Sequence, residues 1–209
     1  MGIKIEKFVG GALDTNGYIV YKNDGGSCYF IDSGYRTDEY ETFIKEHNLT
    51  PKGILFTHHH YDHTSDSPQL AKKLDLPIYI HEEDYEMLKK TFKENISLVK
   101  TFKTDSEFDL DGEKITFIQL KGHTKGGVAI CFEESGVRFT GDTIFDTEIG
   151  ITDLEDGGYD EMSESCLAVS QWDNSIHIYP GHGDDATMDF VKLYNEELKE
   201  ALVYYDENH

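Results

Sequence analysis

The chain has 209 residues, and its 19 Lys and Arg against 41 Asp and Glu give a formal net charge of −22. With 38% hydrophobic and 12% aromatic residues it has enough apolar surface for a folded core, which excludes a disordered acidic chain. The acidic balance argues against a nucleic-acid partner, and no apolar run approaches the roughly 20 residues that span a bilayer. Scattered Cys28, Cys131 and Cys166 predict reduced, buried thiols in a cytoplasmic protein.

The first half of the chain predicts strands that alternate with helices. Residues 17–32 have the pattern of an antiparallel hairpin that follows an opening strand. Thr37 is predicted to cap a helix that Pro51 closes. Beyond it the pattern predicts strands at 53–56 and 78–80 and helices at 65–74 and 82–93.

The second half repeats this order. Strands are predicted at 114–120, 127–132, 137–140 and 176–179, with a helix near 160–170. A final helix is expected to start near Thr187 and to present Phe190, Tyr194, Leu198 and Leu202 on one face. No linker divides the chain, so we expect one domain over residues 1–209 with a sheet-on-sheet core and helices outside.

The sharpest chemical signal directly follows the predicted strand 53–56. Residues 57–64 read Thr-His-His-His-Tyr-Asp-His-Thr. His58 and His60 lie two apart on an extended segment, so their imidazoles point to the same side, and a turn at Tyr61 would bring Asp62 and His63 alongside. Such nitrogen and oxygen ligands suit Zn²⁺ above all, with Fe²⁺ and Mn²⁺ as alternatives. The alternative without a function is a solvated His-rich loop.

Three later strand ends carry further candidate ligands. His123 follows Gly122, Asp142 follows Gly141 and His182 follows Gly181. Each is a weak signal alone, because a His beside Gly is usually an ordinary loop residue. Together with the His-rich segment they place seven candidate ligands at the ends of four strands. Proteins with sheets and helices usually build their sites there, on loops that a rigid sheet holds.

The combined set resembles the metallo-β-lactamase fold superfamily, and within it the short glyoxalase II-like branch. The resemblance implies an α+β four-layer αββα sandwich, with two mixed sheets packed face to face and helices outside. It also implies two divalent metal ions, most simply Zn, with Fe or Mn possible. Its ligand set would be His58, His60 and His123 for the first ion, Asp62, His63 and His182 for the second, and Asp142 as the bridge.

This resemblance implies an enzyme, a binuclear-metal-dependent hydrolase that cleaves a small ester or thioester with a metal-bridging hydroxide. The family suggests a hydroxyacyl thioester as substrate. Metal ions lower the pKa of bound water toward neutrality and polarise a carbonyl. Asp62 is the predicted catalytic residue, which orients the hydroxide or accepts a proton while it ligates metal. Thr57, Thr64 and Thr143 are candidates for hydrogen bonds behind the ligands, with ordinary caps and strand ends as the alternative interpretation.

Other residues near the motif receive simpler interpretations. His59 should face away from its two ligand neighbours, into packing or contacts behind the site. The acidic segment 153–156 is expected to be a solvated loop near the mouth of the site. The family often has Arg where this chain has Ile151, which puts an anion contact there in doubt.

The chain ends about two dozen residues after Gly183, with room for one helix, whereas full-length glyoxalase II enzymes have a helical domain that supplies much of the glutathione site. We therefore expect a small-molecule substrate and poor turnover of glutathione thioesters. The alternatives are a mononuclear-iron persulfide dioxygenase or a lactonase on the same fold, and a non-catalytic metal-binding module. The oligomeric state stays open.

Overall fold

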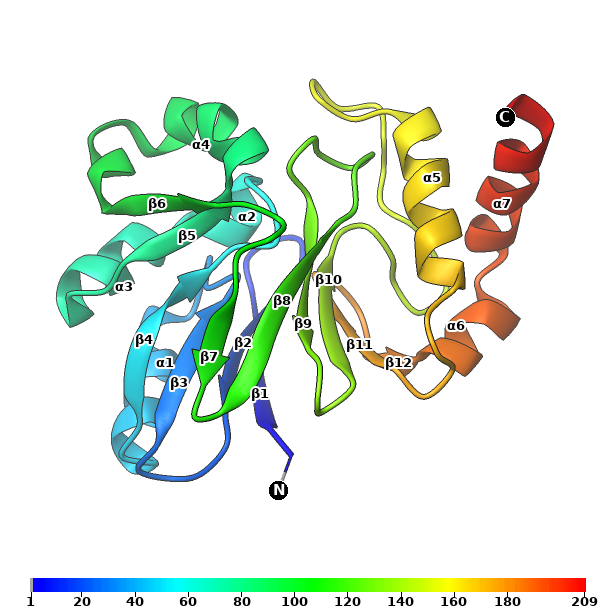
Figure 1. Ribbon diagram of the computed structural model, residues 1–209. Helices are drawn as coiled ribbons and strands as arrows, with labels where there is room; N and C mark the ends of the chain where they lie inside the picture. Colours follow the sequence, from blue (N-terminus) through cyan, green and yellow to red (C-terminus); the bar gives the residue numbers. More distant parts are fainter. Residues whose placement is uncertain (1) are drawn as a thin grey trace.

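The computed structural model describes residues 2–209 and contains two six-stranded sheets that face each other (Figure 1). The first sheet runs β1 (Lys4–Gly10), β2 (Thr15–Tyr21), β3 (Ser27–Ile31), β4 (Thr50–Leu55), β5 (Ile78–His81), β6 (Val99–Phe102). The second runs β12 (Ala186–Thr187), β11 (His177–Pro180), β10 (Val137–Gly141), β9 (Val128–Phe132), β8 (Glu113–Gln119), β7 (Phe108–Leu110). Both sheets are mixed, since β3 to β6 are parallel in the first and β10 pairs parallel with β11 in the second.

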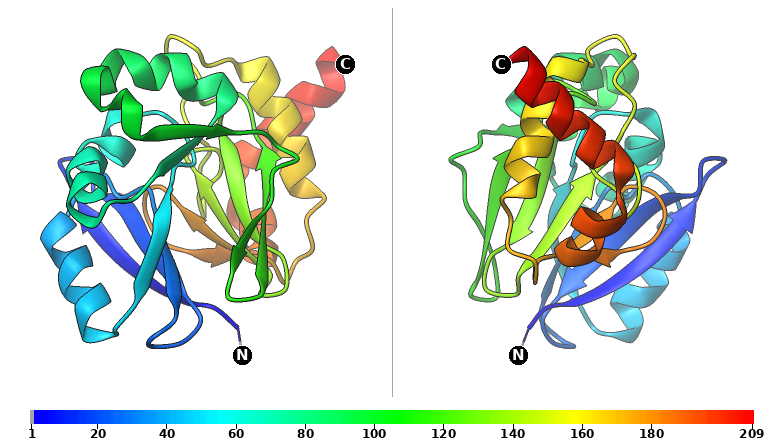
Figure 2. Two further views of the ribbon diagram at one scale, coloured as in Figure 1. Left: turned by 60° about the vertical axis from the view of Figure 1, so that its left-hand side comes forward. Right: turned by 90° about the vertical axis from the view of Figure 1, so that its right-hand side faces the viewer.

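Helices cover the outer face of each sheet, which the views in Figure 2 show from two sides. The first sheet is covered by α1 (Thr37–Glu46), α3 (Ser67–Leu74) and α4 (Tyr85–Phe92). The second is covered by α5 (Tyr159–Ser170), α6 (Met188–Tyr194) and α7 (Glu196–Asn208). Shorter turns are α2 (Tyr61–Thr64), η1 (Glu82–Asp84) and η2 (Lys93–Leu98). The predicted αββα sandwich with mixed sheets is confirmed.

Three apolar clusters fill the spaces between the four layers, and β2 shows how one strand serves two of them. Tyr18 and Val20 point between the sheets, whereas Ile19 and Tyr21 point under the helices of the first sheet. Successive side chains of a strand face opposite ways, so a strand covered on both faces is apolar throughout. The third cluster lies between the second sheet and α5 to α7. All three cysteines are buried in these clusters, as the sequence predicted.

The prediction of one continuous C-terminal helix is wrong. Asn195 has an extended backbone between α6 and α7, and its Oδ1 accepts a hydrogen bond of 2.8 Å from the Leu198 N–H. This is an N-cap, so the chain ends one helix and starts another in a new direction. Phe190 and Tyr194 consequently remain 40% and 55% exposed, while Leu198 is buried at 1%.

Two local predictions near α1 are also wrong. Thr37 lies inside the helix, and Arg36 precedes it with a left-handed φ of 64° and no side-chain cap. Pro51 does not close α1, which already ends at Glu46; it lies within β4, opposite Cys28 of β3. The register of β3 against β4 shifts between Cys28 and Phe30, and such an irregularity accommodates a residue that lacks an N–H donor.

The strands deliver polar loops to one edge of the sandwich. The segments after β3, β4, β8, β10 and β11 meet there, and they carry Asp32, the His-rich segment, His123, Asp142 and His182. Within residues 2–209, none of the helices has the length and apolar character needed to cross a membrane.

Candidate metal centre

The His-rich segment leaves β4 extended and then turns into α2, as the sequence predicted. His60 still has an extended backbone (φ −61°, ψ 148°), and α2 begins at the next residue, Tyr61. The rings of His58 and His60 consequently lie on the same side, with centroids 4.8 Å apart. The helical turn brings the ring of His63 to 4.2 Å from that of His58.

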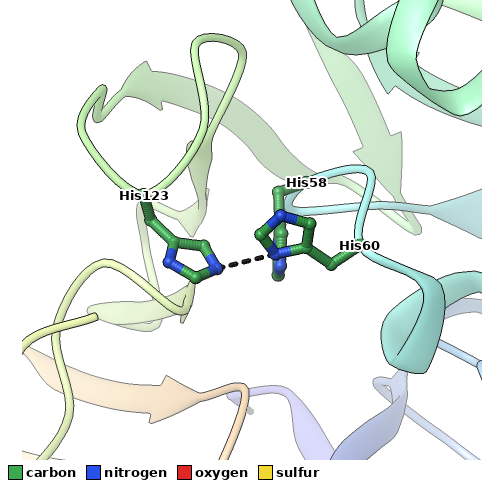
Figure 3. Close-up of side chains that lie close together, drawn as sticks. All are labelled: His58, His60 and His123. Carbon is green, nitrogen blue, oxygen red and sulfur yellow. Dashed lines mark hydrogen bonds between the residues drawn. The ribbon is translucent and has the colours of Figure 1, made fainter. Parts of the chain in front are cut away.

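His58, His60 and His123 form the first group of candidate ligands (Figure 3). Each offers one ring nitrogen, and these three atoms lie within 4.8 Å of one another. His60 Nδ1 and His123 Nε2 are 2.8 Å apart, and the loop after β8 brings His123 to face the His-rich segment. Three imidazole nitrogens that converge in this way are a typical set for Zn²⁺ and related ions.

Asp62, His63 and His182 form the second group, whose ligand atoms also lie within 4.8 Å of one another. Asp62 Oδ2 is 3.3 Å from His182 Nε2 and 3.4 Å from His63 Nε2. His182 reaches this position from the loop after β11.

Asp142 lies between the two groups. Its Oδ2 is 3.5 Å from His123 Nε2 of the first group and 3.3 Å from His182 Nε2 of the second. Its Oδ1 is 3.2 Å from His63 Nε2. Gly181 makes this approach possible, because a Cβ there would lie 2.1 Å from Asp142 Oδ1. The seven predicted site residues are therefore brought together, with a carboxylate in contact with both groups.

Polar contacts behind the rings decide which nitrogen faces the centre. Four imidazoles use Nδ1 for an outward contact and so present Nε2 inward. The contacts are His58 to Thr57 Oγ1 (3.0 Å), His63 to Asp32 Oδ2 (3.1 Å), His123 to Ile151 O (2.8 Å) and His182 to Leu13 O (3.0 Å).

Asp32 is the residue behind the site that sequence reasoning missed. It is 3% exposed, and its carboxylate accepts hydrogen bonds from the Thr57 backbone N–H at 2.8 Å and the Thr57 hydroxyl at 2.6 Å, besides its contact with His63. One signal could have found it, because Asp32 follows β3 as Asp142 follows β10. Gly34 then lets the chain pass close to α2, since a Cβ there would lie 2.0 Å from Asp62 O.

Thr15 was missed as well, and it contacts the predicted catalytic carboxylate. Its hydroxyl donates a hydrogen bond of 2.9 Å to Asp62 Oδ2 from the start of β2. Thr57 makes the kind of contact that the sequence predicted. Thr64 instead donates its hydroxyl to the His60 backbone carbonyl at 2.9 Å, so it fixes the turn into α2.

The two groups differ in charge. Burial lowers the pKa of His60 to about 4 and also lowers those of His58 and His123, so these rings are neutral at pH 7. Neighbouring imidazoles are the second cause at His60 and His58, whereas at His123 the charge of Asp142 opposes the shift without reversing it. Burial also opposes charge on His182, but contacts with Asp142 and Asp62 outweigh it and raise its pKa to about 10. For Asp62 burial raises the pKa, whereas contacts with His182, His63 and Thr15 outweigh this and lower it to about 2.

Buried atoms without partners indicate that the residues fit divalent ions. Within residues 2–209, His58 Nε2, His63 Nε2 and Asp142 Oδ1 are buried and make no hydrogen bond, although the last two lie 3.2 Å apart. Buried polar atoms nearly always have a hydrogen-bond partner or a bound ion, so exceptions that converge on one point indicate a binding site for a further group. The donor set, imidazole nitrogens with carboxylate oxygens, is one that Zn²⁺, Fe²⁺ and Mn²⁺ accept.

His59 faces away from the centre, as predicted. Its Nε2 lies 3.2 Å from Asp156 Oδ2, and its backbone N–H donates to Asp84 Oδ2 at 3.0 Å. The contact between His59 and Asp156 corrects the expectation that the whole acidic segment 153–156 is solvated. Leu154 does lie at the mouth of the site, but the side chain of Asp156 is only 8% exposed, because it pairs with His59.

An open pocket of about 600 Å³ leads to the candidate metal centre. Its floor consists of candidate ligands from both groups together with Asp142. Its walls carry the apolar side chains of Leu13, Tyr61, Phe145, Ile149, Ile151 and Leu154. A cleft with a metal-binding floor and apolar walls is suited to a small molecule.

The four-layer sandwich and the His/Asp set at one edge define a metallohydrolase, and the family model of the metallo-beta-lactamase superfamily matches residues 10–199. The chain belongs to this superfamily. It is 29% identical to an uncharacterized protein of Mycobacterium leprae, over 93% of this chain and 98% of the relative. It is also 29% identical to the hydroxyacylglutathione hydrolase GloC of Haemophilus influenzae, over 84% and 89%. The crystal structure of TTHA1623 in a di-iron-bound form matches with a TM-score of 0.77 at 26% identity, over 91% of this chain and 98% of that one.

Proposed function

We propose that this protein is a hydrolase of small esters or thioesters that uses two divalent metal ions, with a hydroxyacyl thioester as the substrate. The observation that carries the proposal is the contact of Asp142 with imidazoles of both ligand groups, at 3.2 to 3.5 Å. A carboxylate in this position can bridge two ions that each have three further protein ligands.

The complete second group favours this hydrolase over an oxygenase that uses one iron. Asp62, His63 and His182 converge as closely as the three histidines of the first group do. Asp32 and Thr15 contact His63 and Asp62 from behind, which is how proteins hold metal ligands in place. The similar protein TTHA1623 binds two iron ions in its di-iron form. Iron is therefore a candidate for the ions of this protein, as zinc is.

When bound, the two ions would lower the pKa of a water molecule and polarise the carbonyl of the substrate. The residues of the chain would do the rest. Asp62 is ionised at neutral pH, and Thr15 holds one of its oxygens. The Asp62 carboxylate would orient the attacking water and accept its proton. The apolar walls of the pocket would hold the acyl or carrier group and limit its access to bulk water.

A short chain does not exclude a glutathione thioester as substrate. The Haemophilus relative carries the name hydroxyacylglutathione hydrolase although this chain covers 89% of its length. The expectation that turnover of glutathione thioesters is poor must therefore rest on the pocket and not on chain length.

The test is a hydrolysis screen of the metal-loaded protein against hydroxyacyl thioesters, simple esters and lactones, with oxygen consumption on a glutathione persulfide measured in parallel. The proposal predicts that the protein releases a free thiol from a thioester. Metal removal should abolish this release, and Asp62→Asn should lower its rate by about 10²-fold or more. An exposed variant, Asp206→Asn, is the matched control for a charge lost elsewhere. Oxygen consumption without any hydrolysis would replace the proposal by the dioxygenase.

A further inference from the structure

We infer that the pocket selects substrates whose carrier group bears no negative charge, so that uncharged or cationic thiols and alcohols are the leaving groups. The inference rests on the proposed function and names the substrate class of that site. It depends on which side chains line the pocket beyond the candidate ligands.

The mouth of the pocket gathers exposed apolar side chains from three separate segments. Leu13 comes from the turn between β1 and β2, Tyr61 from α2, and Ile151 and Leu154 from the loop before α5. They are exposed by 66%, 66%, 60% and 41%, and they make up four of the ten large hydrophobic residues exposed in residues 2–209. Apolar side chains that gather around a cleft mark a surface for an apolar ligand group.

The remaining charged residues of the lining are acidic. Asp146 and Glu148 line the pocket beside Phe145, and among residues 2–209 the lining has four acidic side chains in all and no Lys or Arg. Two of the four, Asp62 and Asp142, are candidate metal ligands, and their charge would be offset by the ions. Asp146 and Glu148 would keep theirs.

Two lysines near the edge of the pocket, Lys7 and Lys90, are already paired with carboxylates. Lys7 Nζ donates to the carbonyl of the lining residue Gly183 at 3.3 Å, but it also lies 3.8 Å from Asp184 Oδ1. Lys90 lies 2.9 Å from Glu155 Oε1, one residue after Leu154. A carboxylate on a bound carrier would thus meet apolar walls and like charge, and it would lose hydration without gaining a cationic partner.

The experiment compares one hydroxyacyl group on three carriers of similar size: N-acetylcysteamine (neutral), thiocholine (cationic) and 3-mercaptopropionate (anionic). Released thiol is measured colorimetrically with the metal-loaded protein. We expect kcat/KM for the anionic carrier to be at least about fivefold below that for the neutral carrier at low salt, which corresponds to about 1 kcal/mol. The difference should shrink in 1 M NaCl, where the Debye length is about 3 Å.

A charge-reversal variant assigns the effect to the pocket. Asp146→Lys/Glu148→Lys should raise the anionic-to-neutral ratio of kcat/KM by about fivefold or more, since it turns repulsion into attraction. The control, Asp105→Lys/Glu134→Lys, changes the net charge by the same amount at two exposed turns and should leave the ratio unchanged.

Binding of the matching thioether analogues, which cannot be hydrolysed, gives a readout that does not need turnover. Weaker binding of the anionic analogue supports the inference even where no thioester is cleaved, in which case only the proposed reaction fails. Equal or tighter binding and faster turnover of the anionic carrier would overturn the inference while leaving the hydrolase intact. An equal shift of the ratio in the control variant would also overturn it, because the effect would then come from net charge.

Discussion

Asp32→Asn should weaken metal binding at the second ligand group far more than at the first. The Asp32 carboxylate lies 3.1 Å from His63 Nδ1 and accepts two hydrogen bonds from Thr57 at 2.8 and 2.6 Å. An asparagine can keep the bond from the Thr57 backbone with its Oδ1. Its amide NH₂ would then face the His63 N–H and the Thr57 hydroxyl, so donors would oppose donors.

The magnitude follows from these contacts. Partners behind metal ligands are worth about 10- to 100-fold in metal affinity, which corresponds to roughly 1.4 to 2.7 kcal/mol. A buried donor left without an acceptor costs about 1 to 3 kcal/mol in the free energy of unfolding. Asp32 acts on His58 through the Thr57 hydroxyl that lies between them. The metal affinity of the first group should therefore fall much less.

The assay is a competition titration with a metal-binding dye, together with urea unfolding of the metal-free protein. Thr57→Val is the matched variant, because it removes the hydroxyl that contacts His58 and leaves the pair of Asp32 with His63 in place. Asp32→Asn should lower the metal affinity of the second ligand group, and Thr57→Val should lower that of the first. Unchanged second-site affinity in Asp32→Asn would refute the reasoning that the carboxylate holds His63 in position.

Three further outcomes are expected. Asp142→Ala should lower turnover by orders of magnitude and bring metal content below that of the wild type without loss of fold, and wild-type turnover with full metal content would contradict its bridging position. His59→Ala should keep the metal content of the wild type in elemental analysis, because His59 pairs with Asp156 behind the site, and loss of one equivalent would mean that His59 is a ligand. For pH, two imidazoles of the second group have raised pKa values: that of His182 is about 10, and at His63 burial opposes charge but contacts with Asp142 and Asp32 outweigh it and raise the pKa. Both protons must leave before metal binds, so affinity at the second group should fall by about 10- to 100-fold per unit as pH falls from 8 to 6. His60, with a pKa of about 4, is already deprotonated there, so dialysis at pH 6 should empty the second group first, and equal loss from both groups would contradict this.

The part of the candidate ligand set that follows β4 could be predicted from local signals, whereas His123, Asp142 and His182 were weak candidates until the resemblance grouped them with it. His58, His60, Asp62 and His63 lie in one six-residue stretch, and an extended segment followed by a turn fixes their directions. The two-sheet core could be predicted for the same reason, since strand and helix patterns repeat along the chain.

What sequence reasoning missed depends on distant contacts. Thr15 lies 47 residues from Asp62, and Asp32 lies 31 residues from His63. A threonine at a strand start or an aspartate at a strand end is common, so only packing of the two sheets shows which of them contact ligands. The break at Asn195 was missed because apolar residues on both sides of it continue a helical spacing, while the cap depends on one side chain. That residues 1–209 form one domain stays a prediction.

The most direct test of the central claim is metal stoichiometry. Protein purified without oxygen and without added metal should hold close to two divalent ions per chain, and Asp142→Ala close to one or fewer. Titration of metal-free wild-type protein should then restore hydrolysis as the second equivalent binds. One ion per chain with full activity, unaffected by excess zinc, iron or manganese, would contradict the binuclear account.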